Sequence, residues 1–165
     1  MKKTILLAFI ATSLFACKQT ETKVETTAST STSSCVKEGP EVDLMKKAVI
    51  AYANGDWATM ASCFSDTAIS IHNNDTAGIK MSDRIELFKK QRENIEGTVD
   101  AGTPNFEVVT VESKDPRYEG IKWGHAWVRF KFKQKGQAPK SSLTFATLAM
   151  KGDKIIWEQV IYDTK

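Results

Sequence analysis

Histidine and cysteine are scarce in this chain of 165 residues, which contains 2 histidines and 3 cysteines. These residues and the scattered carboxylates lack the close spacing of a metal-binding motif, so we expect no metal site. The sequence also lacks the glycine-rich loop that cradles phosphates and the G-x-S-x-G turn that presents a catalytic serine. No cofactor is therefore expected.

A large excess of charge of one sign is absent as well. The formal net charge is +3, and charged residues make up 26% of the chain. Neutralising a phosphate backbone requires a concentrated basic surface, so nucleic acid is not an expected partner. With 41% hydrophobic residues, the composition is that of a globular protein, and the length suits one domain with its own core.

The apolar run near the N-terminus is too short to span a bilayer. Ile5–Phe15 has eleven residues, whereas a membrane-spanning helix needs about 20. The run follows Lys2 and Lys3 and is followed by the small residue Ala16. A short positive segment, an apolar segment and a small residue together predict an export signal over residues 1–16.

The four residues Leu14-Phe15-Ala16-Cys17 resemble the lipobox of bacterial lipoproteins. The resemblance implies that Cys17 receives a diacylglyceryl group, becomes the mature N-terminus and is then N-acylated, for example with palmitate. Several acyl chains hold a protein on a membrane far more firmly than one chain does. We therefore expect a lipoprotein of the bacterial cell envelope, anchored to the bilayer through Cys17 on the periplasmic or surface side. The alternative is an ordinary signal peptide with a chance cysteine.

Residues 17–39 are expected to form the lipidated cysteine and a disordered tether. Within Lys18–Ser34, ten of seventeen residues are Ser or Thr, and the apolar side chains are too few to offset the loss of chain entropy on folding. One domain then covers residues 40–165. Cys63 falls on an apolar helix face, where we expect a buried thiol. The alternative is a disulfide with Cys35, which an exported compartment would permit.

Three helices and one strand are expected in the first half of the domain. Pro40 suits the first turn of a helix, and Asn54-Gly55 suits its end. Asp56 is a good N-cap for a second, short helix, and Ser82 for a third. Between these helices, Ala68–His72 alternates in the manner of a strand. The third helix is expected to carry Ile85, Phe88 and Ile95 along one side.

After Gly97 the hydrophobic period changes from helical to two, which predicts four strands. A tight turn at Lys151–Lys154 separates the last two strands. Helices that come before an antiparallel meander define an α+β domain. The expected strands are Phe106–Glu112, Lys122–Gln134, Ser141–Met150 and Ile155–Tyr162.

This order of elements resembles the nuclear transport factor 2-like superfamily, which includes ketosteroid isomerases and SnoaL-like polyketide cyclases. The resemblance is carried by Tyr52–Trp57, with its Gly-Asp turn between two helices, and by Phe64–Ala68, which opens the first strand. It implies a cone-like, curved antiparallel sheet wrapped around the N-terminal helices. It also implies an apolar pocket for small molecules or catalysis, and pairing of two subunits through the open side of the sheet.

The isomerase branch of this superfamily uses a carboxylate base, a tyrosine and a protonated carboxylic acid. By resemblance, these positions fall on His72, Ala48 and a place near Ala146. The two hydrogen-bond donors are missing, so isomerase activity by that mechanism is not expected. His72 could still act as a general base, with Asp75 or Tyr52 nearby. The interpretation that we favour for His72 is a polar residue at a strand end that faces solvent or a neighbouring amide.

Two further sets of candidates follow from the resemblance and the strand pattern. The face of Lys122–Gln134 that carries His125 mixes aromatic and basic residues, which suits a contact between two sheets and hence a homodimer. The pocket candidates are Tyr52, Trp57, His72 and Phe88, and the dimer-face candidates are Trp123, His125, Trp127 and Arg129.

Three functions stay open, and the first is preferred. The first is a non-enzymatic, lipid-anchored protein that binds a small apolar molecule or a partner, which requires an open apolar pocket. The second is a cyclase-, dehydratase- or isomerase-like enzyme, which requires His72 inside the pocket with a second polar group within hydrogen-bond reach. The third is a structural envelope module, whose pocket would be filled by side chains such as Tyr52, Trp57 and Phe88.

Overall fold

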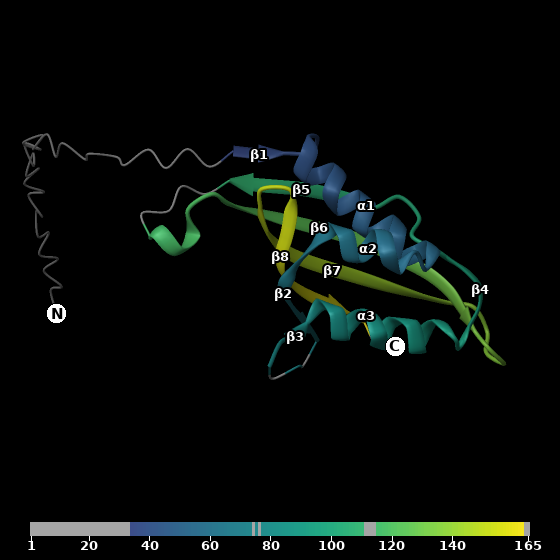
Figure 1. Ribbon diagram of the computed structural model, residues 1–165. Helices are drawn as coiled ribbons and strands as arrows, with labels where there is room; N and C mark the ends of the chain where they lie inside the picture. Colours follow the sequence, from purple (N-terminus) through teal and green to yellow (C-terminus); the bar gives the residue numbers. More distant parts are fainter. Residues whose placement is uncertain (1–33, 74, 76, 111–114, 164–165) are drawn as a thin grey trace, which may run out of the picture. The chain divides into compact units, whose positions relative to one another are not determined.

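The computed structural model describes residues 34–73, 75, 77–110 and 115–163 (Figure 1). The predicted export signal, Cys17 and the greater part of the predicted tether lie outside the described residues. Within the described part of the chain, no helix has both the length and the apolar character needed to cross a membrane. The elements are β1 Ser34–Val36, α1 Pro40–Asn54, α2 Trp57–Cys63, β2 Phe64–His72, β3 Ile79–Lys80, α3 Met81–Arg92, β4 Ile95–Asp100, β5 Asn105–Thr110, a short 3-10 helix Pro116–Tyr118, β6 Ile121–Gln134, β7 Lys140–Lys151 and β8 Lys154–Tyr162.

The ends of the first two helices confirm the sequence prediction. α1 begins at Pro40 and ends at Asn54, and the capping residue Gly55 has a φ of 71°, in the left-handed region that glycine adopts most easily. The Asp56 side chain then caps α2 by accepting a hydrogen bond from the Thr59 backbone N–H at 3.0 Å. The predicted N-cap Ser82 is wrong: α3 begins at Met81, directly after β3. Lys80 ends β3 in an extended conformation and is the N-cap, so the helix starts two residues earlier than expected.

The strands form one curved sheet in the order β1-β5-β6-β7-β8-β2-β3. β5 pairs with the first half of β6, and β4 pairs with the second half along the same edge. The predicted place of Ile95 on the third helix is wrong, because Ile95 opens β4 and pairs with Gln134. Most pairs are antiparallel, but β2 and β8 run parallel. Strands far apart in sequence need no hairpin between them and can pair in either direction.

The first strand of the described residues lies before residue 40, where the domain was predicted to begin. Ser34–Val36, inside the range predicted as tether, pair antiparallel with β5. Their backbone hydrogen bonds to a neighbouring strand account for the order of a segment with few apolar side chains. Cys35 on this strand is exposed and Cys63 is buried, and both are free. The preferred interpretation of Cys63 as a buried thiol is therefore confirmed, and the alternative disulfide is absent.

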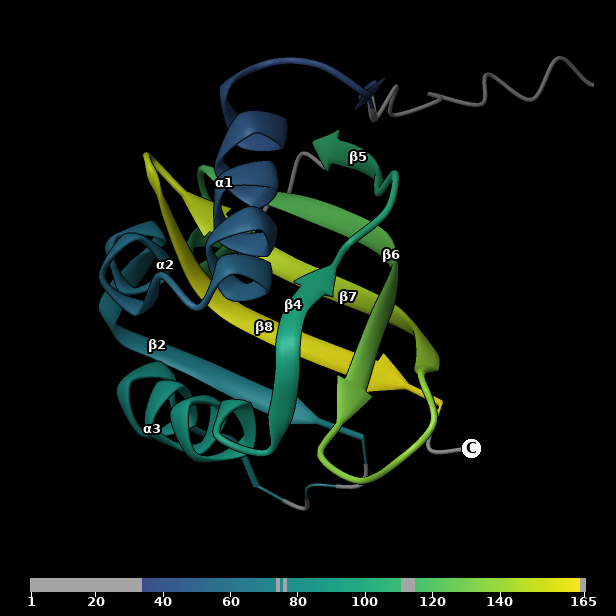
Figure 2. The same ribbon diagram turned by 90° about the vertical axis from the view of Figure 1, so that its right-hand side faces the viewer.

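All three helices pack on one face of the sheet. Buried residues of α1, α2 and α3 share one hydrophobic core with inward-facing residues of β2, β5, β6, β7 and β8. Figure 2 shows the strands curving behind these helices. The α+β class and the curved, mainly antiparallel sheet around the helices are therefore as the sequence predicted.

Candidate functional site

A cavity of about 470 Å³ lies between the helices and the concave face of the sheet. All four pocket candidates, Tyr52, Trp57, His72 and Phe88, line it. Tyr52 forms the centre of an aromatic wall, with its ring centroid 5.1 Å from that of Phe88 and 5.2 Å from that of Phe130. Edge-on packing of this kind is favourable for aromatic rings. These side chains line the cavity instead of filling it. The hypothesis of a purely structural module required a pocket filled by them, so the cavity does not fit that hypothesis.

The cavity opens to solvent at one rim. Lys140, Ser141 and Tyr162 line the cavity and are exposed. Lys140 and Ser141 lie at the start of β7, and Tyr162 lies at the end of β8. These two strands are neighbours in the sheet. A small molecule therefore has a route from solvent to the aromatic wall.

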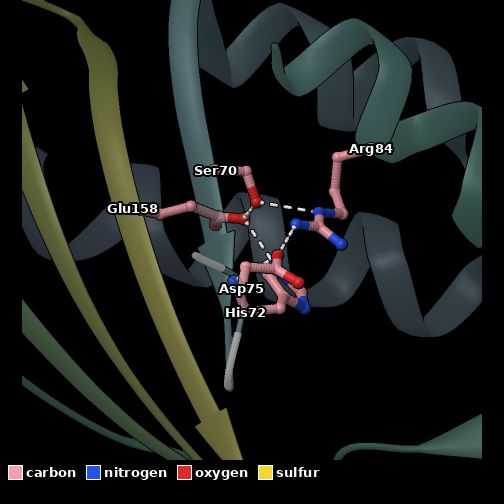
Figure 3. Close-up of polar contacts among 5 residues, drawn as sticks. All are labelled: Ser70, His72, Asp75, Arg84 and Glu158. Atoms are coloured by element: carbon pink, nitrogen blue, oxygen red, sulfur yellow. Dashed lines mark hydrogen bonds and ion pairs between the residues drawn. The ribbon is translucent and has the colours of Figure 1, made fainter. Parts of the chain in front are cut away.

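A buried polar cluster forms where β2, β8 and α3 meet (Figure 3). The parallel pairing of β2 with β8 places Ser70 opposite Glu158. The Ser70 hydroxyl donates a hydrogen bond to Glu158 Oε1 at 2.7 Å, and His72 Nε2 lies 3.3 Å from the same oxygen. From α3, Arg84 Nε donates to the Ser70 hydroxyl at 3.2 Å. Three segments distant in sequence thus supply one hydrogen-bonded group.

Asp75 completes the cluster from the loop that follows β2. Arg84 Nη2 donates to Asp75 Oδ2 at 2.5 Å, and the His72 backbone N–H donates to the same oxygen at 2.9 Å. The hydrogen bond from His72 and, next, the bond from Arg84 lower the pKa of Asp75. Asp75 therefore keeps its negative charge at neutral pH and neutralises Arg84.

The interpretation of His72 as a solvent-facing residue is wrong. Its exposed fraction is 8%, and it lines the cavity beside Phe88. His72 is the last residue of β2 and shares the inward face with Ala68 and Ser70, so its direction follows from strand alternation. An ionised carboxylate only accepts hydrogen bonds, so His72 Nε2 must carry the proton when Glu158 is ionised. His72 Nδ1 is then the nitrogen that can accept a proton.

The positions inferred from the isomerase branch all line the same cavity. Ala48 on α1 and Ala146 on β7 line it together with His72. A methyl group cannot donate a hydrogen bond to a developing oxyanion, so this cavity lacks both donors at those positions.

Ser70, Arg84 and Glu158 belong to the cluster but were not among the predicted site residues. A signal for two of them is present in the sequence. Arg84 precedes Ile85 in the apolar stripe of α3, and Glu158 has the same strand parity as the buried Val160. A charged residue in an apolar stripe requires a buried partner, which is the pattern that could have identified them.

The predicted dimer-face residues lie together on the convex face of the sheet. Trp123 packs edge-on against Trp157 with ring centroids 6.1 Å apart, and His125 stacks on Phe145 at 5.8 Å. Trp127 is half-buried beside Phe145, and Arg129 is exposed. The helices pack on the opposite face, so this aromatic surface has no helix over it among the described residues.

The sequence matches no family model and no curated protein. The fold, by contrast, is similar to solved structures. A protein of ketosteroid isomerase-like fold from Catenulispora acidiphila, in complex with trimethylamine, matches with a TM-score of 0.55 and 13% identity, over 74% of this chain and 86% of that one. An NTF2-like protein from Anabaena variabilis matches with a TM-score of 0.56 and 13% identity, over 76% and 88%.

A third similar structure is that of a proposed polyketide cyclase from Xanthomonas campestris. It matches with a TM-score of 0.54 and 11% identity, over 75% of this chain and 90% of that one. Together with the curved sheet, these similarities show that the domain has the nuclear transport factor 2-like fold. At such low identity they define the fold alone, because one fold carries many unrelated functions.

Proposed function

We propose that the domain binds a small molecule with a mainly apolar body and a polar group in the cavity. The observation that carries this proposal is a solvent-connected cavity of about 470 Å³ that combines an aromatic wall with one buried polar cluster. Small-molecule sites ordinarily have volumes of about 300–1,000 Å³ and few polar groups. The trimethylamine in the similar structure from Catenulispora acidiphila supports small-molecule binding by this fold.

Fluorescence titration with the neutral dye phenylnaphthylamine tests this proposal. Ala146→Phe would fill part of the cavity, whereas Ala58→Phe on an exposed position of α2 is the matched control. We expect Ala146→Phe to weaken dye binding at least about tenfold, since that corresponds to only about 1.4 kcal/mol. Equal affinity in both variants, or no dye binding by the unaltered protein, would contradict the proposal. Native mass spectrometry of the same protein would also show any small molecule that stays bound after purification.

A second candidate function is proton-transfer catalysis on the bound molecule. The observation that favours it is the position of His72 inside the cavity, with Glu158 Oε1 3.3 Å from Nε2. A carboxylate that holds one imidazole nitrogen orients the ring and leaves the other nitrogen as a general base. A cyclase-, dehydratase- or isomerase-like enzyme requires a second polar group within hydrogen-bond reach of His72. Glu158 meets this requirement.

The probe for this second function is nitrobenzisoxazole, an apolar molecule whose carbon-bound proton can be removed by a base. Proton removal breaks the ring N–O bond, and the product is a coloured cyanonitrophenolate. We expect the unaltered protein to accelerate this reaction, and His72→Gln to reduce the acceleration by about 10²–10⁴-fold. Equal rates for both proteins would contradict the proposal that His72 is a catalytic base. That result would leave the binding proposal intact.

We also propose that the chain is a lipoprotein of the bacterial cell envelope, anchored through an acylated Cys17. The support is the sequence pattern of residues 1–17, with Lys2 and Lys3, an eleven-residue apolar run and the lipobox-like residues. Cys17→Ser is expected to move the protein from the membrane fraction to the soluble fraction of cells. Unchanged fractionation would contradict the anchor.

The convex aromatic surface supports a last proposal, a homodimer formed through the sheet. Aromatic residues and arginine are enriched at the centres of protein interfaces. Trp123, Trp127 and Arg129 meet this description, and exposed Leu143 and Ile161 extend the apolar surface.

A further inference from the structure

Four residues of α3 line the cavity: Arg84, Phe88, Gln91 and Arg92. Arg84, Phe88 and Arg92 follow one another at four-residue spacing. Residues four apart lie on the same side of a helix. With a rise of about 1.5 Å per residue, the two arginines lie roughly 12 Å apart along the helix axis. The cavity therefore has a cationic side chain near each end of α3, with an aromatic ring between them.

The two arginines differ in their partners. Arg84 is neutralised by Asp75 and bound to Ser70. Within the described part of the chain, Arg92 donates one hydrogen bond, from Nη2 to the backbone carbonyl of Gly97 at 3.3 Å. Arg92 Nη1 is buried and has no hydrogen-bond partner within the described residues. Within the same residues no carboxylate forms an ion pair with Arg92. Arg92 as a whole is half-buried and lines the cavity, so its positive charge, which has no ion pair, favours an anion in the cavity.

Tyr52 provides a second unpaired donor near Arg92. No hydrogen bond of the Tyr52 hydroxyl exists within the described residues, and the ring lines the cavity. Burial raises the pKa of Tyr52 although the positive charge of Arg92 acts in the opposite direction. Tyr52 is therefore a neutral O–H donor at physiological pH, and it lines the same cavity as Arg92.

We propose that the cavity is selective for monocarboxylates, with Arg92 and Tyr52 binding the carboxylate and the aromatic wall holding the apolar body. An ionised acceptor makes stronger hydrogen bonds than a neutral one, and Arg92 forms no ion pair within the described residues. The carboxyl group of Glu158, near His72, disfavours a second acidic group on the ligand. The inference rests on the proposed binding function and specifies its class of ligand.

The test is isothermal titration of the full chain carrying Cys17→Ser with ligands that share a body and differ in the head group. Decanoate, decanol and decylamine form an aliphatic series, and naphthoate with naphthalenemethanol forms an aromatic pair. We expect each carboxylate to bind at least about tenfold more tightly than its alcohol, and decylamine to bind no more tightly than decanol. The series that shows the larger difference identifies which kind of acid the cavity prefers.

Arg92→Gln should remove the preference for carboxylate and leave decanol affinity within about twofold, because only the charge-assisted bond is lost. Arg92→Lys should keep part of the preference, and Arg117→Gln, an exposed arginine paired with Asp115, should keep all of it. Equal binding of decanoate and decanol by the unaltered protein would overturn the inference while leaving the proposed binding function in place. Binding of phenylnaphthylamine without any binding of decanoate or naphthoate would do the same. Failure of every ligand and of the neutral dye would overturn both.

Discussion

At the scale of single residues, the polar cluster shows how charged groups can be kept inside an apolar domain. Arg84 and Glu158 are each at most 8% exposed, and each has hydrogen-bond partners within the cluster. Burying a charge is tolerated only when it is paired and hydrogen-bonded. The cluster therefore constrains the positions of β2, β8 and α3 as well as the chemistry of the cavity.

Asp75→Asn tests this electrostatic arrangement through the pH dependence of stability. Because its pKa is lowered in the folded state, Asp75 stabilises the fold above its unfolded pKa of about 3.9, and the contribution is lost as pH falls through the folded pKa. In urea titrations at a series of pH values, we expect the unaltered protein to exceed the variant in unfolding free energy at neutral pH. The difference should shrink as the solution becomes strongly acidic.

Asp66→Asn, a change at an exposed position of β2, is the matched control and should leave stability nearly unchanged at every pH. A constant offset between Asp75→Asn and the unaltered protein over the whole acidic range would contradict the assigned role of the Asp75 charge.

The sequence predicted some residues of this site and missed others for one physical reason. Tyr52 and Trp57 flank the local Gly-Asp turn that carries the family resemblance, and their place in the pocket was what the resemblance implied. Ser70, Arg84 and Glu158 meet only after folding, because Arg84 lies 14 positions and Glu158 lies 88 positions beyond Ser70 in the sequence. Nothing in the sequence alone specifies which strand pairs with β2, so their contact could not be predicted.

At the scale of elements, the helix ends that depend on neighbouring residues were predicted, whereas short strands that depend on a distant partner were missed. The Gly55 and Asp56 caps depend on neighbouring residues only, and both were predicted. β3 and β4 are short and exist because a partner strand offers free backbone groups to them. Short apolar segments cannot be assigned to helix or strand by periodicity alone, and Ile95 is an example.

Met45 of α1 packs tightly against Gly124 of β6, and this contact gives a prediction about packing. A Cβ atom at Gly124 would lie 2.4 Å from Met45 Sδ and 2.8 Å from Met150 Cε. Both methionines are only 1% exposed, so neither can move away freely. We expect Gly124→Ala to lower the unfolding free energy by about 1–3 kcal/mol, measured by equilibrium unfolding in urea.

A double variant provides the control for this prediction. Met45→Val shortens the facing side chain, so Gly124→Ala combined with Met45→Val should be more stable than the sum of the two single effects implies. Additive losses, or a Gly124→Ala variant as stable as the unaltered protein, would show that the helix and strand are not in the contact described.

At the scale of the whole domain, strand alternation assigns two different tasks to the two faces of one sheet. On β6, Val128 points into the cavity, and the neighbouring Trp127 points to the convex face. The concave face, covered by helices, holds the cavity and the polar cluster. The convex face holds the aromatic surface, so a change on one face can leave the other intact.

Ile161→Glu tests the proposed dimer with little risk to folding. Ile161 is 52% exposed and lies opposite Phe145 on the convex face, so the substitution places a charge within the aromatic surface. Ile50→Glu on α1, at a residue 55% exposed, is the matched control away from that face. By analytical ultracentrifugation, we expect Ile161→Glu to weaken self-association at least about tenfold and Ile50→Glu to leave it unchanged, because an unpaired charge at the centre of an interface must lose its hydration. Binding of phenylnaphthylamine should be the same in both variants, since the cavity lies on the other face.

An unaltered protein that sediments as a monomer at all concentrations would show that the convex face does not join two copies of this chain. Equal association of the two variants would show the same.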